Sequence, residues 1–370
     1  MLRLRAILAM SAIPAVLSAV VLVGACTTSY FTDDNADLST LDLAIPTGSD
    51  LATATKDLAT PDLAMQYSCR GQDAPGKSYK LVMNQLTLPS SSGTGSFAYD
   101  FDGDGRTENQ LKSLISTIAI AGLDMQKPLQ AAVESGQIIN LLAIQSAATD
   151  TASCVGVTLN RGKLGPMPKF DGSDVFSPVT LFGSPLGGSL LSGKLATMDS
   201  RILKADTESS FALSISLGRG LLPLPLRGVH VEGRLQLVGS LWQVSAGVIH
   251  GVVAKSDLDS KVLPAVADQV TQIINSDPFS SSARALINLF ESSTDPVSVN
   301  KCVIAARCCR LNPATCMILP DEVRNSSVGA VLSPDVEVLD EMGKWKPVPG
   351  GKKYNAMSVG IGFSAISASF

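Results

Sequence analysis

Alternation of apolar and polar residues with a period of two constrains the fold of this chain more than any other feature. It occurs in residues 209–217, in residues 229–237 with a break at Gly233, and in residues 357–370 before its phase slips at Ala365–Ile366. Residues 79–89 are a further β-rich run, and residues 241–253 follow Gly239 as a partner strand would. A period of two places every second side chain on the same face of a strand, so each alternating segment predicts a half-buried β-strand. We therefore expect antiparallel sheets, arranged either as a sandwich or as one rolled sheet.

Helical spacing of apolar residues is found in fewer segments. The clearest covers residues 256–275, where Asp257 or Ser260 is a candidate N-cap. Shorter helices are predicted for residues 111–121, 128–134 and 282–291. The sequence thus predicts an α+β fold that is dominated by strands, with two to four helices packed against the sheets.

The first residues predict export and a lipid anchor. Two arginines in residues 1–5 precede an uncharged apolar run, residues 6–23, as in a secretory signal. The following Val23-Gly24-Ala25-Cys26 resembles the lipobox of bacterial lipoproteins. We expect residues 1–25 to be the signal peptide and Cys26 to carry lipid that attaches the protein to a membrane. An uncleaved membrane anchor is the alternative. Thr27 follows the cysteine, and a residue other than Asp at this position resembles the sorting signal that directs Gram-negative lipoproteins to the outer membrane.

Residues 27–66 predict a disordered acidic tether. They repeat an Asp-Leu-Ala/Ser unit and carry seven Asp against a single Lys. Such a stretch cannot bury enough apolar surface to offset its chain entropy. Because the tether takes up most of the negative charge, residues 67–370 are close to neutral and are predicted to form one β-rich domain. A neutral domain gives no reason to expect nucleic acid as a partner.

The chain has seven cysteines, and an odd number in an exported protein needs an explanation. If Cys26 carries lipid, six cysteines remain that can pair in an oxidising compartment; they are Cys69, Cys154, Cys302, Cys308, Cys309 and Cys316. The last four lie within fifteen residues and are expected to form at least one disulfide. Cys69 with Cys154 is the natural third pair, although six cysteines allow other connectivities. Zinc is a disfavoured alternative, because no paired C-x-x-C is present.

Residues 100–108, DFDGDGRTE, resemble the first half of a calcium loop. Three carboxylates at alternate positions precede Gly105, which is expected to make the sharp turn. The candidate ligands are Asp100, Asp102, Asp104, the carbonyl of Arg106, and Glu108. The twelfth position is Leu111 instead of the Glu of an EF-hand, so Glu108 or Asn109 would supply the closing oxygen. We expect Ca²⁺ in a structural role. The alternative is a turn whose side chains bond only its own backbone.

Sequence features of enzymes are weak. The two histidines, His230 and His250, lie in apolar strand-like segments and fit ordinary core or edge positions. Ser358, in residues 356–360, has the local sequence of a nucleophile elbow, but a strand-like segment follows where a helix is needed. We therefore predict no catalytic residue and no enzymatic activity, with a hydrolase as the least favoured alternative.

Taken together, four features resemble uncharacterised lipoproteins of myxobacteria and their relatives. They are the lipobox, the Asp-Leu-Ala-rich tether, the segment YDFDGDGRTENQL at 99–111, and the C-terminal segments 332–340 and 357–370. The resemblance implies that the acidic loop is a regular feature of this kind of domain. We expect a non-enzymatic envelope protein that binds or organises a partner. The alternative is a carrier of lipid or another apolar ligand, with a cavity between the strands and the helix at 256–275.

Overall fold

The computed structural model describes residues 76–90, 96–120, 124–147, 152–163, 165, 167–179, 189–197, 201–206, 210–216, 220–292, 294–304 and 307–370. These residues belong to the unit that spans Gln66–Phe370. The predicted signal peptide, lipidated Cys26 and acidic tether lie outside the described residues, and so does Cys69.

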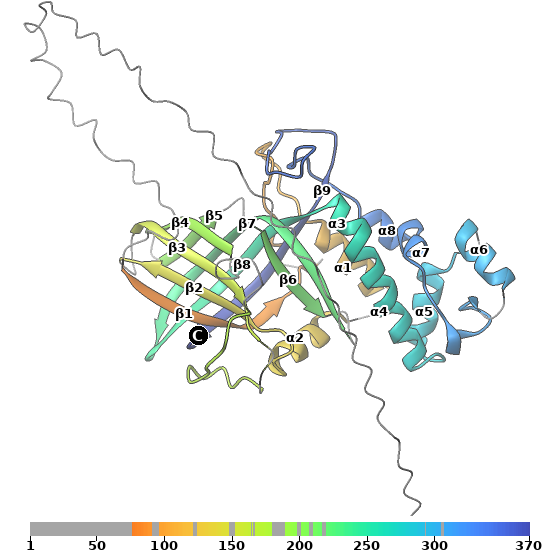
Figure 1. Ribbon diagram of the computed structural model, residues 1–370, viewed down its shortest axis with the longest axis horizontal. Coiled ribbons are helices and arrows are strands. Elements are labelled where there is room, and N and C mark those ends of the chain that lie inside the picture. The colour runs from red at the N-terminus through yellow and green to blue at the C-terminus, as the bar shows by residue number, and fades with distance from the viewer. Residues whose placement is uncertain are drawn as a thin grey trace, which may run out of the picture. The chain divides into compact units, whose positions relative to one another are not determined.

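The described residues form one strongly curled antiparallel sheet, in the order β5-β4-β3-β2-β1-β9-β8-β7-β6 (Figure 1). Strand β5 also pairs with β7, so the sheet curls back on itself. It is therefore the rolled sheet of the two predicted arrangements. The strands are β1 (Lys77–Thr87), β2 (Asn140–Ser146), β3 (Ala152–Arg161), β4 (Ser189–Thr197), β5 (Arg201–Asp206), β6 (Ser210–Ser216), β7 (Leu221–Val238), β8 (Leu241–Ala254) and β9 (Ala356–Ser367).

The strands predicted from alternation are present as β6, β7 and β9, the predicted partner strand is β8, and the β-rich run at residues 79–89 is β1. The break in alternation at Gly233 is a β-bulge, because the register between β7 and β8 shifts between Glu232 and Arg234. Strand β9 lies between β1 and β8, so the two ends of the described fold are hydrogen-bonded side by side.

The helices are α1 (Gln110–Ile120), α2 (Gln126–Glu134), α3 (Lys255–Asp257), α4 (Leu263–Ser276), α5 (Ser281–Phe290), α6 (Pro296–Val303), α7 (Pro320–Asn325) and α8 (Ser327–Val331). The predicted helix at 256–275 forms as α3, a π-helical turn (Leu258–Val262) and α4. Neither Asp257 nor Ser260 caps it, since helical structure begins at Lys255 directly after β8. The prediction of two to four helices was too low, because it missed the short helices α6 to α8. No described helix has both the length and the apolar character needed to cross a bilayer.

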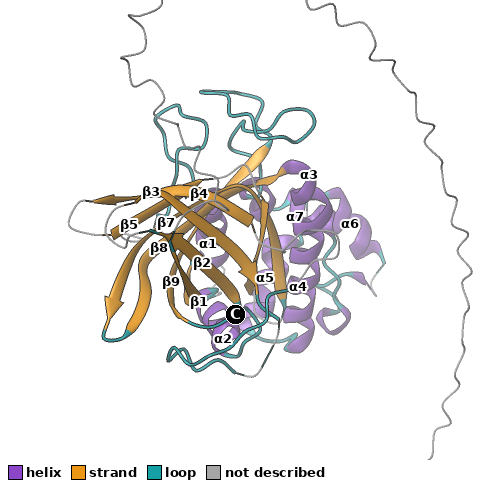
Figure 2. Ribbon diagram, turned by 60° about the vertical axis from the view of Figure 1, so that its left-hand side comes forward, coloured by secondary structure: helices purple, strands orange, loops and turns teal. Residues whose placement is uncertain are grey.

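The helices cover one face of the curled sheet (Figure 2). Helix α1 packs on β9, α2 packs on β1, and α4 packs against α5 and α7. Fully buried side chains such as Leu142, Ile249 and Ile361 of the sheet belong to the same core as Val266 of α4 and Leu286 of α5. The strand and helix residues that were predicted to line a ligand cavity therefore pack together in this core.

Two smaller apolar clusters lie on the other face. One contains Val82, Leu141 and Ile366, and Phe370 packs against it. Ile366 thus faces away from the main core that holds Phe363, which explains the apparent slip in alternation near the C-terminus. The other small cluster positions the acidic loop; its buried members are Phe101, Val252, Ala254, Val336, Val338, Leu339 and Ala356.

Candidate functional site

The acidic loop is the tip of a small hairpin that is bound to β9. Tyr99 and Glu108 close the hairpin through two backbone hydrogen bonds of 3.1 and 3.0 Å. At its base, Asn109 Nδ2 donates to the carbonyl of Gly360 (3.1 Å), and Asn109 Oδ1 accepts from the Gly360 N–H (3.0 Å). A Cβ at Gly360 would lie 1.8 Å from the carbonyl oxygen of Phe97, so glycine is needed for this close approach. The base of the loop is therefore fixed to the sheet.

Glu108 and Asn109 are the two predicted closing ligands, and the structure gives Asn109 a second role. The side-chain oxygen of Asn109 is turned toward the backbone of β9 and accepts a hydrogen bond there. Oε2 of Glu108 has no such contact within the part of the chain that the structure describes, so Glu108 is the candidate for the closing oxygen that we carry forward.

A buried aromatic ring anchors the loop from within. Phe101, only 4% exposed, fills the small cluster between β8, β9 and the segment that precedes β9. The ring of Tyr99 meets it edge to face, with centroids 5.1 Å apart. Phe101 thus points inward, while the carboxylates on either side of it belong to the loop tip, where Asp100 is half-buried and Asp102 is 7% exposed.

Three carboxylates meet at the tip of this hairpin. Asp100, Asp102 and Asp104 each offer an oxygen, and these oxygens lie within 4.8 Å of one another. Gly103 and Gly105 have φ angles of +78° and +86°, so both make left-handed turns. The prediction of a sharp turn at Gly105 is confirmed.

The same aspartates also bond the backbone of their own loop. Asp100 accepts from the N–H groups of Gly103 (2.7 Å) and Gly105 (3.0 Å), and Asp104 accepts from that of Arg106 (2.8 Å). Asp102 accepts from Asp104 N–H at 3.2 Å. Because a carboxylate has about four lone-pair sites, these bonds leave acceptor capacity for a cation.

Glu108 lies outside the group of three aspartates but is electrostatically coupled to them. Its Oε2 is buried and has no hydrogen-bond partner among the described residues. Burial, followed by the negative charges of Asp102, Asp104 and Asp100, raises the pKa of Glu108 to about 7. Four carboxyl groups therefore crowd one hairpin, and hard oxygen donors of this kind suit Ca²⁺.

The two histidines lie next to this hairpin. His230 of β7 and His250 of β8 are directly paired, and both are buried, so of the predicted core or edge positions they occupy core positions. The ring of Tyr99 lies 4.4 Å from His230 and 5.0 Å from His250, between ring centroids. His230 Nε2 contacts Glu232 Oε1 at 2.9 Å, and this bond lowers the pKa of Glu232 to about 2. Burial, and then the charge of His230, lowers the pKa of His250 to about 4.

Ser358 has a structural role in the described fold. It lies within β9 and is fully buried, and its Oγ accepts from the N–H of Gln110 at the start of α1 (2.8 Å). It also donates its hydroxyl proton to Asp335, which in turn accepts from the Ser358 N–H at 2.7 Å. Burial raises the pKa of Asp335 in spite of these bonds. Residues 356–360 are strand, as expected, so the strand-turn-helix context of a nucleophile elbow is missing.

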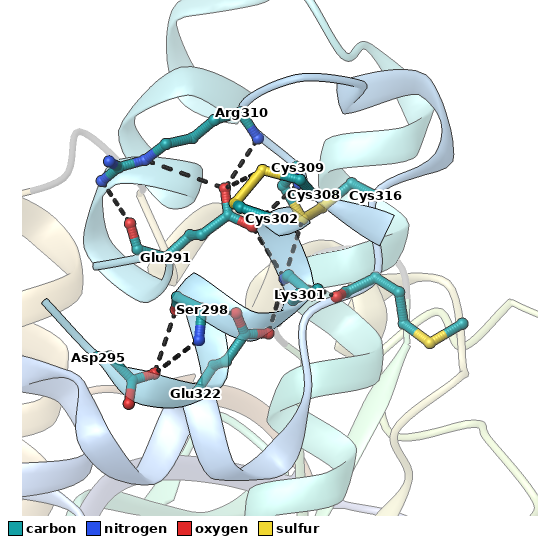
Figure 3. The surroundings of a disulfide bond; sticks show 11 residues. Glu291, Asp295, Ser298, Lys301, Cys302, Cys308, Cys309, Arg310, Cys316 and Glu322 are labelled. Atoms are coloured by element: carbon teal, nitrogen blue, oxygen red, sulfur yellow. Dashed lines mark hydrogen bonds and ion pairs between the residues drawn. A yellow bond between two sulfur atoms is a disulfide. The ribbon is translucent and has the colours of Figure 1, made fainter. Parts of the chain in front are cut away.

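The C-terminal cysteines form two disulfides, Cys302–Cys308 and Cys309–Cys316 (Figure 3). The expectation of at least one disulfide in this cluster is confirmed. All four sulfurs are engaged in disulfides, so the thiolates that zinc would need are not present. Cys154 in β3 is also disulfide-bonded, but its predicted partner, Cys69, lies outside the described residues.

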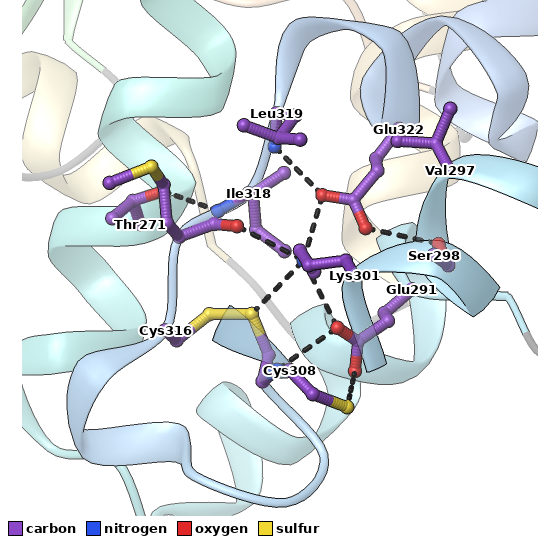
Figure 4. A network of polar contacts seen from close by, with 12 residues as sticks. Thr271, Glu291, Val297, Ser298, Lys301, Cys308, Cys316, Ile318, Leu319 and Glu322 are labelled. Atoms are coloured by element: carbon purple, nitrogen blue, oxygen red, sulfur yellow. Dashed lines mark hydrogen bonds and ion pairs between the residues drawn. A yellow bond between two sulfur atoms is a disulfide. The ribbon is translucent and has the colours of Figure 1, made fainter. Parts of the chain in front are cut away.

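Beside these disulfides is a buried ion network that the sequence did not predict. Lys301 Nζ lies 3.0 Å from Glu291 Oε1 and 2.8 Å from Glu322 Oε2, and it donates to the carbonyl of Met317 (Figure 4). Each of the three charged side chains is at most 3% exposed. The network joins the end of α5 to α6 and α7, two short helices that contribute only Val323 to the buried apolar core.

An apolar groove opens on the outer side of the same segment. Its volume is about 620 Å³, and it is lined by Val297, Asn300, Lys301, Ile304, Arg307, Thr315, Met317 and Leu319. Other apolar side chains lie nearby in the sequence and are exposed, with Val303 at 80% and Leu311 at 65%. This is an exposed apolar surface on a segment that two disulfides hold in shape.

Comparison of the chain with protein-family models, with curated proteins and with solved structures gives no match. Function is therefore argued from the described sites themselves.

Proposed function

We propose that the protein is a lipid-anchored envelope protein whose domain is stapled by calcium and which binds a partner without catalysing a reaction. One observation carries the calcium part of this proposal. The carboxylates of Asp100, Asp102 and Asp104 converge on a hairpin tip, and Glu108 stands close enough for their charges to raise its pKa.

A calcium ion in the loop would stabilise the domain through the contacts that hold the hairpin in place. The hairpin is joined to β9 by Asn109, to the small apolar cluster by Phe101, and directly to the start of α1 at Gln110. A cation among the carboxylates would offset their mutual repulsion and hold the loop in its folded shape. Because only the folded hairpin brings these oxygens together, calcium binding would stabilise the whole domain.

The anchor part rests on residues 1–66. The basic and apolar segments before Val23-Gly24-Ala25-Cys26 support cleavage and lipidation at Cys26, and Thr27 supports the outer membrane as the destination. Incorporation of labelled palmitate in the native bacterium tests this claim. We expect incorporation in the wild-type protein and none in Cys26→Ala. Palmitate that persists in Cys26→Ala would refute it.

Terbium luminescence tests the calcium site directly. Tyr99 precedes Asp100, so its ring is placed to sensitise Tb³⁺ bound in the loop. We expect saturable luminescence that Ca²⁺ displaces, and a loss of both in Asp102→Asn. Asp171→Asn is the matched control, because Asp171 is an exposed aspartate that bonds Ser173 in a separate turn. Luminescence that is unchanged in Asp102→Asn would refute the assignment.

The second candidate function is a carrier of lipid or another apolar ligand. The groove beside α6 favours it, since apolar side chains line most of its surface. Organic extraction of the purified protein followed by mass spectrometry tests this candidate. We expect a bound lipid to be lost in Ile304→Asp and retained in Val303→Asp, because Val303 is exposed but does not line the groove. A protein that yields no lipid in any form would eliminate this candidate.

A further inference from the structure

A second cavity, polar in character, lies at the junction of β7, α3 and the segment before β9. It has a volume of about 580 Å³, and its chemically distinctive lining residues are Arg227, Asp257, Lys261, Lys344 and Trp345. Small-ligand sites have volumes of about 300–1,000 Å³ and combine an apolar surface with a few fixed polar groups. The cavity therefore has the size and the composition of a ligand site.

The cavity carries an excess of positive charge. Asp257 binds both Arg227, at 3.0 Å, and Lys261, at 2.6 Å. Although burial alone would raise it, the hydrogen bonds from Lys261 and Arg227 hold the pKa of Asp257 below its ordinary value, so this residue is a carboxylate. Lys344 forms no ion pair with any residue that the structure describes. Three cations thus face one anion, which favours a ligand with a negative charge.

Two of the three positive groups, Arg227 and Lys261, are held in place by Asp257 before any ligand binds. Arg227 donates its second nitrogen to the carbonyl of Gly343 at 2.9 Å, which ties β7 to a hairpin. That hairpin is closed by the bridge between Leu339 and Trp345, and Asp340 accepts from backbone N–H groups within it. Preorganised groups of this kind lose less conformational entropy on binding.

Trp345 supplies a flat apolar surface on the same hairpin. Its ring rests against the backbone of Gly228, which has a φ of +55°. A Cβ at Gly228 would lie 2.2 Å from the ring, so the ring can take this position only over glycine. An aromatic ring that lines a polar cavity is suited to pack against a ring of the ligand.

We propose that this cavity binds an acidic saccharide, with a sugar carboxylate on the cationic groups and a sugar ring on Trp345. Asp257 favours this ligand over a polyphosphate or a nucleotide. Its carboxylate can accept from sugar hydroxyl groups, whereas it would repel a chain of phosphates. The inference names a ligand class for the binding role proposed above, and it depends on neither calcium nor the lipid anchor.

Tryptophan fluorescence of the full-length protein tests this proposal. The chain has two tryptophans, Trp242 and Trp345, so Trp242→Phe leaves Trp345 as the only reporter. The probe is a hyaluronan tetrasaccharide, which carries glucuronic acid, and chitotetraose is the neutral saccharide of the same length. Tripolyphosphate is the anion without a sugar ring. Calcium is left out, so that failure of the calcium proposal does not affect the result.

We expect the hyaluronan tetrasaccharide to change Trp345 fluorescence saturably and to bind at least about tenfold more tightly than chitotetraose. Lys344→Met should weaken this binding about tenfold, as expected for one charge-assisted hydrogen bond. Lys352→Met is the matched control, because Lys352 belongs to the same basic segment but does not line the cavity. Circular dichroism checks that both variants are folded.

Four results would overturn the proposal. They are no saturable change with the acidic saccharide, equal binding of chitotetraose, tighter binding of tripolyphosphate, or an equal loss of affinity in Lys352→Met. The last result would mean that the ligand responds only to the overall charge of residues 344–353.

Discussion

Replacement of Lys301 by methionine should destabilise the domain by about 3 kcal/mol. The methionine keeps most of the apolar stem but removes the ammonium group that contacts Glu291 and Glu322. Loss of one partner from a buried ion pair costs about 3–5 kcal/mol, because a charge is left uncompensated. We take the lower end of this range, because both glutamates keep other hydrogen bonds in the variant. Glu291 still accepts from the N–H groups of Cys309 and Arg310. Glu322 still accepts from the Ser298 hydroxyl and from the N–H of Leu319.

Urea unfolding followed by circular dichroism, without reducing agent, measures this effect. Lys127→Met is the control, because Lys127 pairs with Asp124 at the surface, with side chains 87% and 52% exposed. Such a pair contributes at most about 1 kcal/mol. If both variants lose the same free energy of unfolding, the buried network does not stabilise the fold as argued.

Three further predictions concern the hairpin and its neighbours. Gly360→Ala should cost about 2–4 kcal/mol in urea unfolding, because the new Cβ would meet the Phe97 carbonyl at 1.8 Å and push the hairpin off β9; an unchanged midpoint would contradict it. The pKa of His250 falls from 6.5 to about 4 on folding, so stability should be complete above pH 6.5 and should drop as the pH falls toward 4; the drop should be up to about 3 kcal/mol and should be smaller in His250→Phe. The pKa of Glu108 rises from 4.5 to about 7, so calcium-free stability should fall as the pH rises through 7. Calcium affinity should rise up to about tenfold between pH 6 and pH 8 in a calorimetric titration, and an equal rise in Glu108→Gln would contradict this role.

The sequence predicted strands best where the two faces carry different kinds of residue. The alternation in residues 209–217 was clear because β6 begins with exposed residues that alternate with buried apolar ones. Strand β9 is buried on both faces, but it alternates because one face carries Gly and Ser, and Phe97 packs closely against Gly360 and Gly362 there. Strand β2, with the sequence NLLAIQS, is buried along nearly all of its length, so it has no alternation to detect. Helices α6 to α8 have five to eight residues, too few for periodicity to reveal. A disulfide and buried ions hold α6 and α7, and α8 packs against α1 and α7.

Whether a candidate site could be predicted also depends on how far apart its residues lie in the sequence. The acidic loop was predictable because Asp100, Asp102 and Asp104 are neighbours in the sequence and form a turn by themselves. The pairing of His230 with His250 depends on the register between β7 and β8, which no single segment encodes. The cavity at Trp345 likewise joins residues more than a hundred positions apart, such as Arg227 and Gly343.

The free energy of unfolding in calcium and in chelator tests the central claim most directly. Urea unfolding of the wild-type protein should shift by about 2.7 kcal/mol when calcium is present at a hundred times its dissociation constant. Asp102→Asn should show little or no shift under the same conditions, while Asp171→Asn should behave as the wild type. A wild-type unfolding curve that is the same in calcium and in chelator would contradict the calcium staple.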